Sequence, residues 1–127
     1  MENKAYIFEL QDFHKKWIND LDFYKEQVKV FEERLAKVSL NNVDKDVKIE
    51  VEKFQNRFII QRNEIDYLRH DIKQQENELE REEKTAPIIS EMETITEEFT
   101  LKDRMDTFER LFLDLQLEFD TFIEKHI

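Results

Sequence analysis

Apolar residues recur along this chain in alternating steps of four and three, and this spacing constrains the fold more than any other feature. An α-helix turns through about 100° per residue, so the spacing places the apolar side chains on one face of a helix. Three series of this kind follow one another, in a chain with no glycine and one proline. The spacing therefore predicts an all-α protein built from long amphipathic helices.

The members of each series are mostly large aliphatic and aromatic residues. The first series consists of Leu10, His14, Trp17, Leu21, Tyr24, Val28, Phe31, Leu35 and Val38. The second consists of Val47, Val51, Phe54, Phe58, Gln61, Ile65, Leu68, Ile72, Gln75 and Leu79. The third consists of Ile88, Met92, Ile95 and Phe99, then, in a different phase, Leu101, Met105, Phe108, Phe112, Leu115, Phe119 and Phe122. This change of phase predicts that the third helix is kinked or broken near residues 99–101.

Turn-forming and helix-capping residues separate the series. Asn42 follows the first series and suits the N-cap of the second helix. Pro87 cannot continue the second helix but suits the first turn of a third, and Ser90 with Glu93 resembles a capping box there. The predicted helices span about residues 6–39, 43–84 and 87–127.

These helices are similar enough in length to pack side by side. At about 1.5 Å per residue they extend roughly 50 to 63 Å, and the short connections make successive helices antiparallel. We expect residues 1–127 to form one domain, an elongated up-down-up three-helix bundle with coiled-coil-like packing. Thr100 with Asp103 resembles a further capping box, so a bundle of four helices is the alternative.

Charge and cysteine content limit the function classes. The net charge of −11 disfavours binding to nucleic acid or to an anionic membrane, because both attract basic surfaces. No segment approaches the roughly 20 apolar residues that span a bilayer, and the N-terminus lacks the apolar run of a signal peptide. Without cysteine the chain needs no oxidising compartment. We expect a cytoplasmic protein that contacts neither nucleic acid nor membrane.

Negative charge is concentrated between residues 76 and 98. This stretch holds nine glutamates and two basic residues, Arg81 and Lys84. In an antiparallel bundle it surrounds one end of the molecule and forms an acidic pole. Such a pole could bind a basic protein partner or divalent cations, and the alternative is a solvated, fraying helix end.

Three polar residues, His14, Gln61 and Gln75, occupy positions of the apolar series. His14 and Gln75 lie roughly 12 to 14 Å from the same end of the antiparallel pair, so we expect them in one layer of the core. A buried hydrogen bond between them would satisfy both side chains and set the register of the helices. Gln61 is expected to act in register or at an interface. The alternative is a metal or small-ligand site in the core around His14.

The chain contains no recognisable catalytic motif. The Glu-x-x-His motif, which places a carboxylate and an imidazole on one metal in di-iron bundles, is absent. Asp66 and His70 are one turn apart and, with His14, are the candidate metal ligands, although the pair falls on the far side of its helix from the core. A glycine-rich phosphate loop and a nucleophile elbow both need glycine, and the chain has none, so both motifs are absent. We expect a non-enzymatic protein with no catalytic residue and no cofactor.

Several large apolar residues lie outside the three series. A helix that is apolar on more than one face is normally covered on more than one face, so these residues are candidates for an association surface, most simply that of a homodimer. The alternative is that they are scattered surface residues. The eight candidates are Phe23, Val30, Ile49, Ile59, Ile60, Tyr67, Leu113 and Leu117.

Parts of the first two predicted helices resemble a known family. The segments are His14-Lys-Lys-Trp-Ile-Asn-Asp-Leu-Asp-Phe-Tyr-Lys, Val51-Glu-Lys-Phe-Gln-Asn-Arg-Phe-Ile-Ile-Gln-Arg and Ile65-Asp-Tyr-Leu-Arg-His70. They are similar to a family of small, acidic, uncharacterised bacterial helical-bundle proteins, over about the first half of the chain. The resemblance implies a bacterial cytoplasmic bundle and implies no activity and no site residue.

Two function hypotheses follow from the sequence. The first is a non-enzymatic interaction or scaffold bundle that associates with itself through apolar residues outside the series. The second is a bundle that binds a metal or a small ligand through His14 or through Asp66 and His70.

Overall fold

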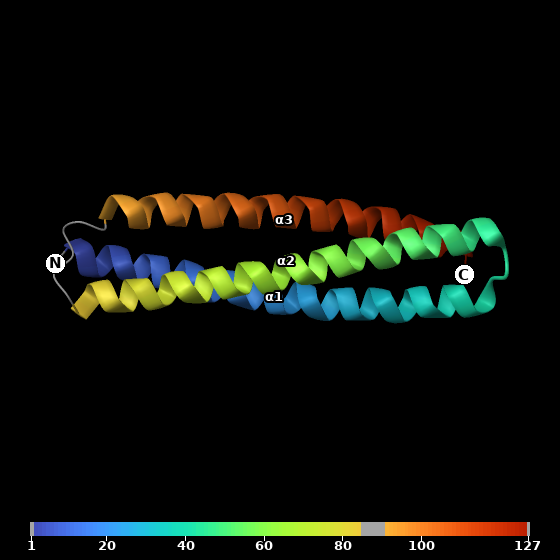
Figure 1. The fold of residues 1–127 in the computed structure, drawn as a ribbon, viewed down its shortest axis with the longest axis horizontal. Coiled ribbons are helices and arrows are strands. Elements are labelled where there is room, and N and C mark those ends of the chain that lie inside the picture. Colours follow the sequence, from blue (N-terminus) through green and yellow to red (C-terminus); the bar gives the residue numbers. More distant parts are fainter. Residues whose placement is uncertain (1, 85–90, 127) are drawn as a thin grey trace.

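The computed structural model of this chain describes the backbone of residues 2–84 and 91–126 and the side chains of residues 6–81 and 93–126. The described residues form three helices, α1 (Glu2–Asn41), α2 (Lys45–Lys84) and α3 (Glu91–His126). Figure 1 shows them packed side by side in an up-down-up order, with the start of α1 beside the end of α2 and the start of α3. The predicted all-α three-helix bundle is therefore confirmed.

The connection between α1 and α2 is capped differently from the prediction. Asp44, rather than Asn42, is the N-cap of α2, because its carboxylate accepts a hydrogen bond from the backbone N–H of Asp46 at 2.9 Å. Asn42 instead donates to the backbone carbonyl of Val38 at 2.8 Å and so satisfies the C-terminal end of α1. The predicted start of the third helix between Pro87 and Ser90 lies outside the described residues.

The buried side chains of α1 and α2 follow the predicted series. In the half of the bundle near the α1–α2 connection the core is aromatic: Phe58 packs against Phe31 at 5.9 Å and against Phe119 at 5.1 Å between ring centroids. Phe119 also packs against Phe54 at 5.4 Å. Each fully buried phenylalanine stabilises the fold by roughly 1.5–3 kcal/mol relative to an exposed one. Edge-to-face and tilted ring contacts of this kind join all three helices.

The third helix differs from its prediction. Helix α3 is continuous from Glu91 to His126, and Figure 1 shows no sharp bend in it. Its buried residues keep one phase throughout, because Thr94 and Glu98 precede Leu101 at steps of four and three and are both buried. Phe99, assigned to the core by the sequence, is 70% exposed. The expected break near residues 99–101 and the alternative of four helices are therefore wrong.

Thr100 shows how the helix passes through this region. Its hydroxyl donates to the backbone carbonyl of Thr96 at 2.9 Å, one turn earlier in the same helix. A residue at an N-cap would instead accept a hydrogen bond from a backbone N–H of the next turn. The resemblance of Thr100 and Asp103 to a capping box therefore marks no helix start.

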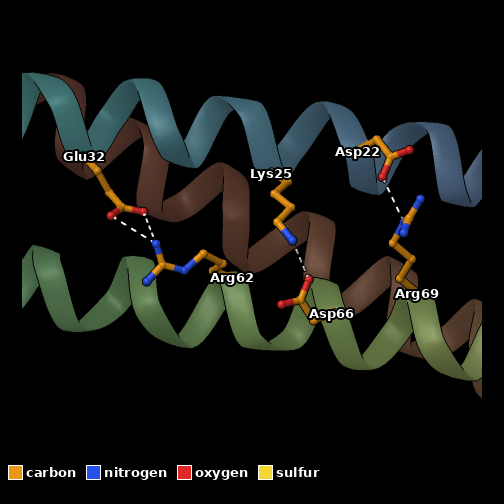
Figure 2. Close-up of polar contacts among 6 residues, drawn as sticks. All are labelled: Asp22, Lys25, Glu32, Arg62, Asp66 and Arg69. Atoms are coloured by element: carbon orange, nitrogen blue, oxygen red, sulfur yellow. Dashed lines mark hydrogen bonds and ion pairs between the residues drawn. The ribbon is translucent and has the colours of Figure 1, made fainter.

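Ion pairs join the exposed borders of α1 and α2. Figure 2 shows three of them in a row along the two helices. They are Asp22–Arg69 at 2.9 Å, Lys25–Asp66 at 2.8 Å and Glu32–Arg62 at 2.9 Å. Each exposed pair contributes roughly 0.2–1 kcal/mol, so they specify the antiparallel register more than they stabilise the bundle.

The other two helix–helix borders differ in their ion pairs. Arg104 of α3 contacts Asp71 at 2.7 Å and Glu64 at 3.6 Å, both on α2, and Arg57 of α2 pairs with Glu118 of α3. Among the described side chains, α1 and α3 are joined by one ion pair, the buried pair of His14 and Glu98. On the exposed border between α1 and α3, Lys16 and Asp20 of α1 interact electrostatically with Glu109 of α3 without a direct ion pair between the helices.

No helix, over the residues that the structure describes, carries a stretch long and apolar enough to cross a lipid bilayer.

Candidate functional site

A buried imidazole between two carboxylates is the most unusual feature of the core. His14 of α1 is 2% exposed, and each of its ring nitrogens contacts a glutamate from another helix. The Nδ1 atom lies 2.6 Å from Oε2 of Glu76 on α2, and the Nε2 atom lies 2.6 Å from Oε1 of Glu98 on α3. All three helices therefore meet at this triad, Glu76–His14–Glu98.

The geometry favours a charged imidazole. A neutral imidazole carries one N–H and can donate to one carboxylate only, whereas the imidazolium carries two. Burial by itself lowers the pKa of His14, but its hydrogen bonds to Glu98 and Glu76 and the charges of these carboxylates raise the pKa above its ordinary value of 6.5. With both carboxylates ionised and His14 protonated, the triad carries one net negative charge.

The triad replaces the contact that the sequence predicts for His14. Gln75 is buried, as expected for a member of the series. The ring nitrogens of His14, however, contact Glu76 and Glu98, so the predicted hydrogen bond between His14 and Gln75 is wrong. A charged acceptor forms the stronger hydrogen bond with an imidazolium, which is the physical reason for the preference. Gln61 is half-buried, and its Oε1 atom is buried without a hydrogen-bond partner.

One oxygen of the triad is not satisfied. Glu98 is 8% exposed, and its Oε2 atom is buried with no hydrogen-bond partner. A buried acceptor without a donor costs about 1–3 kcal/mol, and more when it is charged. Glu98 also lines a hollow of about 220 Å³ between α1 and α3, whose other lining residues are Tyr6, Leu10, Phe13, Trp17, Ile95, Phe99, Lys102 and Asp106.

The two other candidate metal ligands, Asp66 and His70, have different partners. Asp66 pairs with Lys25 of α1, whereas His70 lies 3.3 Å from Asp71, its neighbour in the chain. His14 directs its two nitrogens to different carboxylates, so these do not converge on one point. In the part of the chain that the structure describes, no three His, Asp or Glu side chains are arranged to hold a metal ion.

The eight candidates for an association surface are all exposed, from Val30 at 37% to Tyr67 at 63%. They do not form a single patch, because successive residues of a helix point in different directions. Ile60 lines a hollow between α2 and α3 together with Leu111, a further exposed apolar residue. Phe23 and Val30 lie on the other side of the molecule, on the border of α1 that faces α3.

Two rows of residues define the border between α1 and α3. Phe13 and Phe99 line the hollow at one end of this border, and Arg34 and Ile123 line a second hollow, of about 690 Å³, at the other end. Steps of three and four residues connect these ends along each helix. The exposed apolar side chains on the two rows are Phe13, Phe23, Val30, Phe99 and Leu113.

The acidic pole is partly described. Glu78, Glu93 and Glu97 line a hollow of about 350 Å³ between α2 and α3, on the side of Glu98 opposite the apolar hollow. Arg81 contacts Glu78 at 2.5 Å. The remaining glutamates between residues 82 and 92 have side chains outside the described part. Binding of a basic partner at this pole stays a prediction.

Comparison with family models, with curated proteins and with solved structures finds no match to this chain. The resemblance to small bacterial helical-bundle proteins therefore stays a hypothesis. The chemistry of the chain has to be inferred from its own side chains.

Sequence reasoning missed both carboxylates of the triad. Glu98 has a detectable signal, because steps of three and four backward from Leu101 reach Glu98 and Thr94 and continue the series without a change of phase. Glu76 has no such signal, since it lies beside the series of α2 rather than in it. Its contact with His14 depends on how α1 and α2 are aligned along their axes.

Proposed function

We propose that this chain is a non-enzymatic interaction protein, an elongated bundle that pairs with a second copy of itself through the border between α1 and α3. The observation that carries this proposal is a group of exposed apolar side chains on that border, Phe23, Val30 and Leu113. We call this group the α1–α3 patch.

The two halves of the patch lie at one level of the bundle. Tyr24, next to Phe23, packs against Phe112, next to Leu113, with ring centroids 4.7 Å apart. Phe31, next to Val30, also packs against Phe112, at 6.0 Å. Aromatic packing between α1 and α3 therefore holds the exposed residues of both helices across one border.

The patch suits a second copy for two reasons. Among the described side chains, the exposed border between α1 and α3 lacks ion pairs between the two helices of the kind that join the other two borders, so an apolar surface that packs on it breaks none of them. Both helices also contribute apolar residues, so a two-fold axis at this level places the patch of one copy on the patch of the other. In such a dimer, α1 and α3 of the second copy would cover side chains that α1 and α3 of the first copy leave exposed.

Sedimentation of the purified chain at micromolar concentrations tests the proposal. We expect a dimer, and we expect the double variant Phe23→Ser/Leu113→Ser to raise the dissociation constant at least tenfold, because it removes two of the apolar contacts. The matched control is Ile49→Ser/Tyr67→Ser, which removes two similarly exposed apolar residues from α2 and should sediment like the native chain. A native chain that stays monomeric at about 100 μM, equivalent to a very weak contact, would contradict self-association.

A further inference from the structure

The apolar hollow beside the triad combines three properties of a ligand site. It has a volume of about 220 Å³, its walls are mostly apolar, and a buried carboxylate lines it. Small-molecule sites in proteins are typically concave and apolar with a few polar groups that orient the ligand.

The carboxylate of Glu98 favours a ligand that donates a hydrogen bond. Oε1 of Glu98 accepts from His14 at 2.6 Å, whereas Oε2 of the same carboxylate is buried without a partner. Oε2 is closed to water, so a ligand in the hollow would have to bring an N–H to this atom by displacing the side chains that cover it, and that N–H would supply the missing donor. Because the triad contains two carboxylates and one imidazole, a cationic donor would also add a positive charge beside a second carboxylate.

The walls select an apolar body of limited size. Phe13 and Trp17 stack with ring centroids 6.1 Å apart, and Phe99 lies on the opposite helix. Aromatic faces attract cations as well as hydrocarbon. An apolar cavity of about 150 Å³ accommodates benzene, so the present hollow suits one ring with a short side chain.

We propose that this hollow binds a small apolar primary amine, with its ammonium group donating to Glu98 and its hydrocarbon part between Phe13, Trp17 and Phe99. The site lies within one copy of the chain and does not depend on the α1–α3 patch. Lys102 and Asp106 also line the hollow, and their opposite charges offset each other. The carboxylate of Glu98 therefore decides which ligand charge the hollow favours. An anionic ligand would instead have to use Lys102 while lying close to the buried carboxylate.

Fluorescence of Trp17, the only tryptophan of the chain, gives a direct measurement, because this residue lines the hollow. The probe is 2-phenylethylamine, titrated at pH 7, where it is cationic. We expect saturable binding with a dissociation constant below about 1 mM. The neutral analogue 2-phenylethanol and the anionic analogue 3-phenylpropionate should bind at least about tenfold more weakly, since neither supplies a cation to Glu98.

Two variants test separately how the charge of Glu98 and the apolar wall of the hollow contribute to the affinity for the amine. Glu98→Gln should weaken binding of 2-phenylethylamine at least about tenfold, because the charge-assisted hydrogen bond is lost. Phe99→Ala should weaken it roughly fivefold through loss of one ring contact. The matched control is Phe8→Ala, since Phe8 is 65% exposed, like Phe99 at 70%, but does not line the hollow. Its affinity should equal that of the native chain.

Several results would overturn the assignment. These are the absence of a Trp17 response at about 10 mM amine, equal or tighter binding of 3-phenylpropionate, and unchanged affinity in a folded Glu98→Gln variant. If Glu98→Gln does not fold, equal affinities of Phe99→Ala and Phe8→Ala would have the same meaning. The double variant Phe23→Ser/Leu113→Ser should still bind the amine, which distinguishes a failure of this site from a failure of self-association. Loss of binding in that variant would overturn a site within one copy.

Discussion

At the scale of single residues, His14 has the largest consequences for this protein. It is a buried imidazole held between two carboxylates, and its two hydrogen bonds, each 2.6 Å long, connect α1 with α2 and α3. Taking such charges out of water is costly, and the pairing offsets this cost only while the imidazole is protonated. The stability of the bundle should therefore depend on the charge of one side chain.

This dependence predicts a loss of stability at alkaline pH. The pKa of His14 in the folded chain lies above its ordinary value of 6.5, so the folded state holds the proton more tightly than the unfolded state. The stabilisation is complete below the unfolded pKa and is lost as the pH rises through the folded pKa. We expect the free energy of unfolding, measured with urea between about pH 6 and about pH 9, to decrease with increasing pH.

The variant His14→Gln provides the control for this measurement. It has no titrating group at this position, so the difference in unfolding free energy between the native chain and the variant should shrink as the pH rises. The groups that face His14 from the other two helices, Glu76 and Glu98, are present in both proteins. A difference that is constant over the whole range would show that His14 has the same pKa in the folded and the unfolded chain.

At the scale of elements, α3 shows how a helix can keep its register with polar residues in core positions. Thr94 and Glu98 are buried at the positions that continue the steps of Leu101 and Met105. The apolar residues Ile95 and Phe99 lie next to these positions and line the hollow instead. The helix therefore gives up apolar burial in its first turns and gains the contact between Glu98 and His14.

This register predicts effects of very different size for two nearby substitutions. Leu101→Ala should lower the free energy of unfolding by about 2–5 kcal/mol, because Leu101 is 2% exposed and its truncation leaves a cavity. Phe99→Ser should change it by no more than about 0.5–1 kcal/mol, since the ring is exposed. Urea denaturation of both variants checks the prediction. An effect of Phe99→Ser as large as that of Leu101→Ala would indicate that Phe99 is buried in the core, as the series Ile88, Met92, Ile95 and Phe99 predicts.

At the scale of the whole molecule, charge and apolar surface act against each other in the proposed dimer. Each copy carries a net charge of −11, so two copies repel each other at long range. The α1–α3 patch has to overcome this repulsion through contacts that are apolar and largely independent of salt. The balance between the two should depend on ionic strength.

We therefore expect salt to strengthen self-association. Raising sodium chloride from about 0.05 M to about 0.5 M shortens the Debye length severalfold and screens the repulsion between the copies, so the dissociation constant of the dimer should fall. Sedimentation equilibrium over this range measures the change. A dissociation constant that rises with salt would indicate an interface held by opposite charges, such as the acidic pole against basic residues, instead of the apolar patch.

The sequence by itself determined the three helices and most of the core, because the direction of a side chain around a helix depends only on its position in the same helix. The series of α1 and α2 were predicted correctly, and so was the exposure of residues such as Phe23 and Ile60. The same local reasoning failed at Phe99, where apolar character alone suggested a core position. Local periodicity cannot decide between two phases when polar residues occupy the core positions of one of them.

Only the tertiary structure decided which side chains meet. Glu76 and Glu98 are 62 and 84 residues away from His14 along the chain, and their contacts depend on the alignment of three helices along their axes. A shift of one turn, about 5.4 Å, would separate these groups without changing any helical face. The triad, the unsatisfied oxygen of Glu98 and the hollow beside it follow from that alignment, which is a property of the packed bundle and not of any one helix.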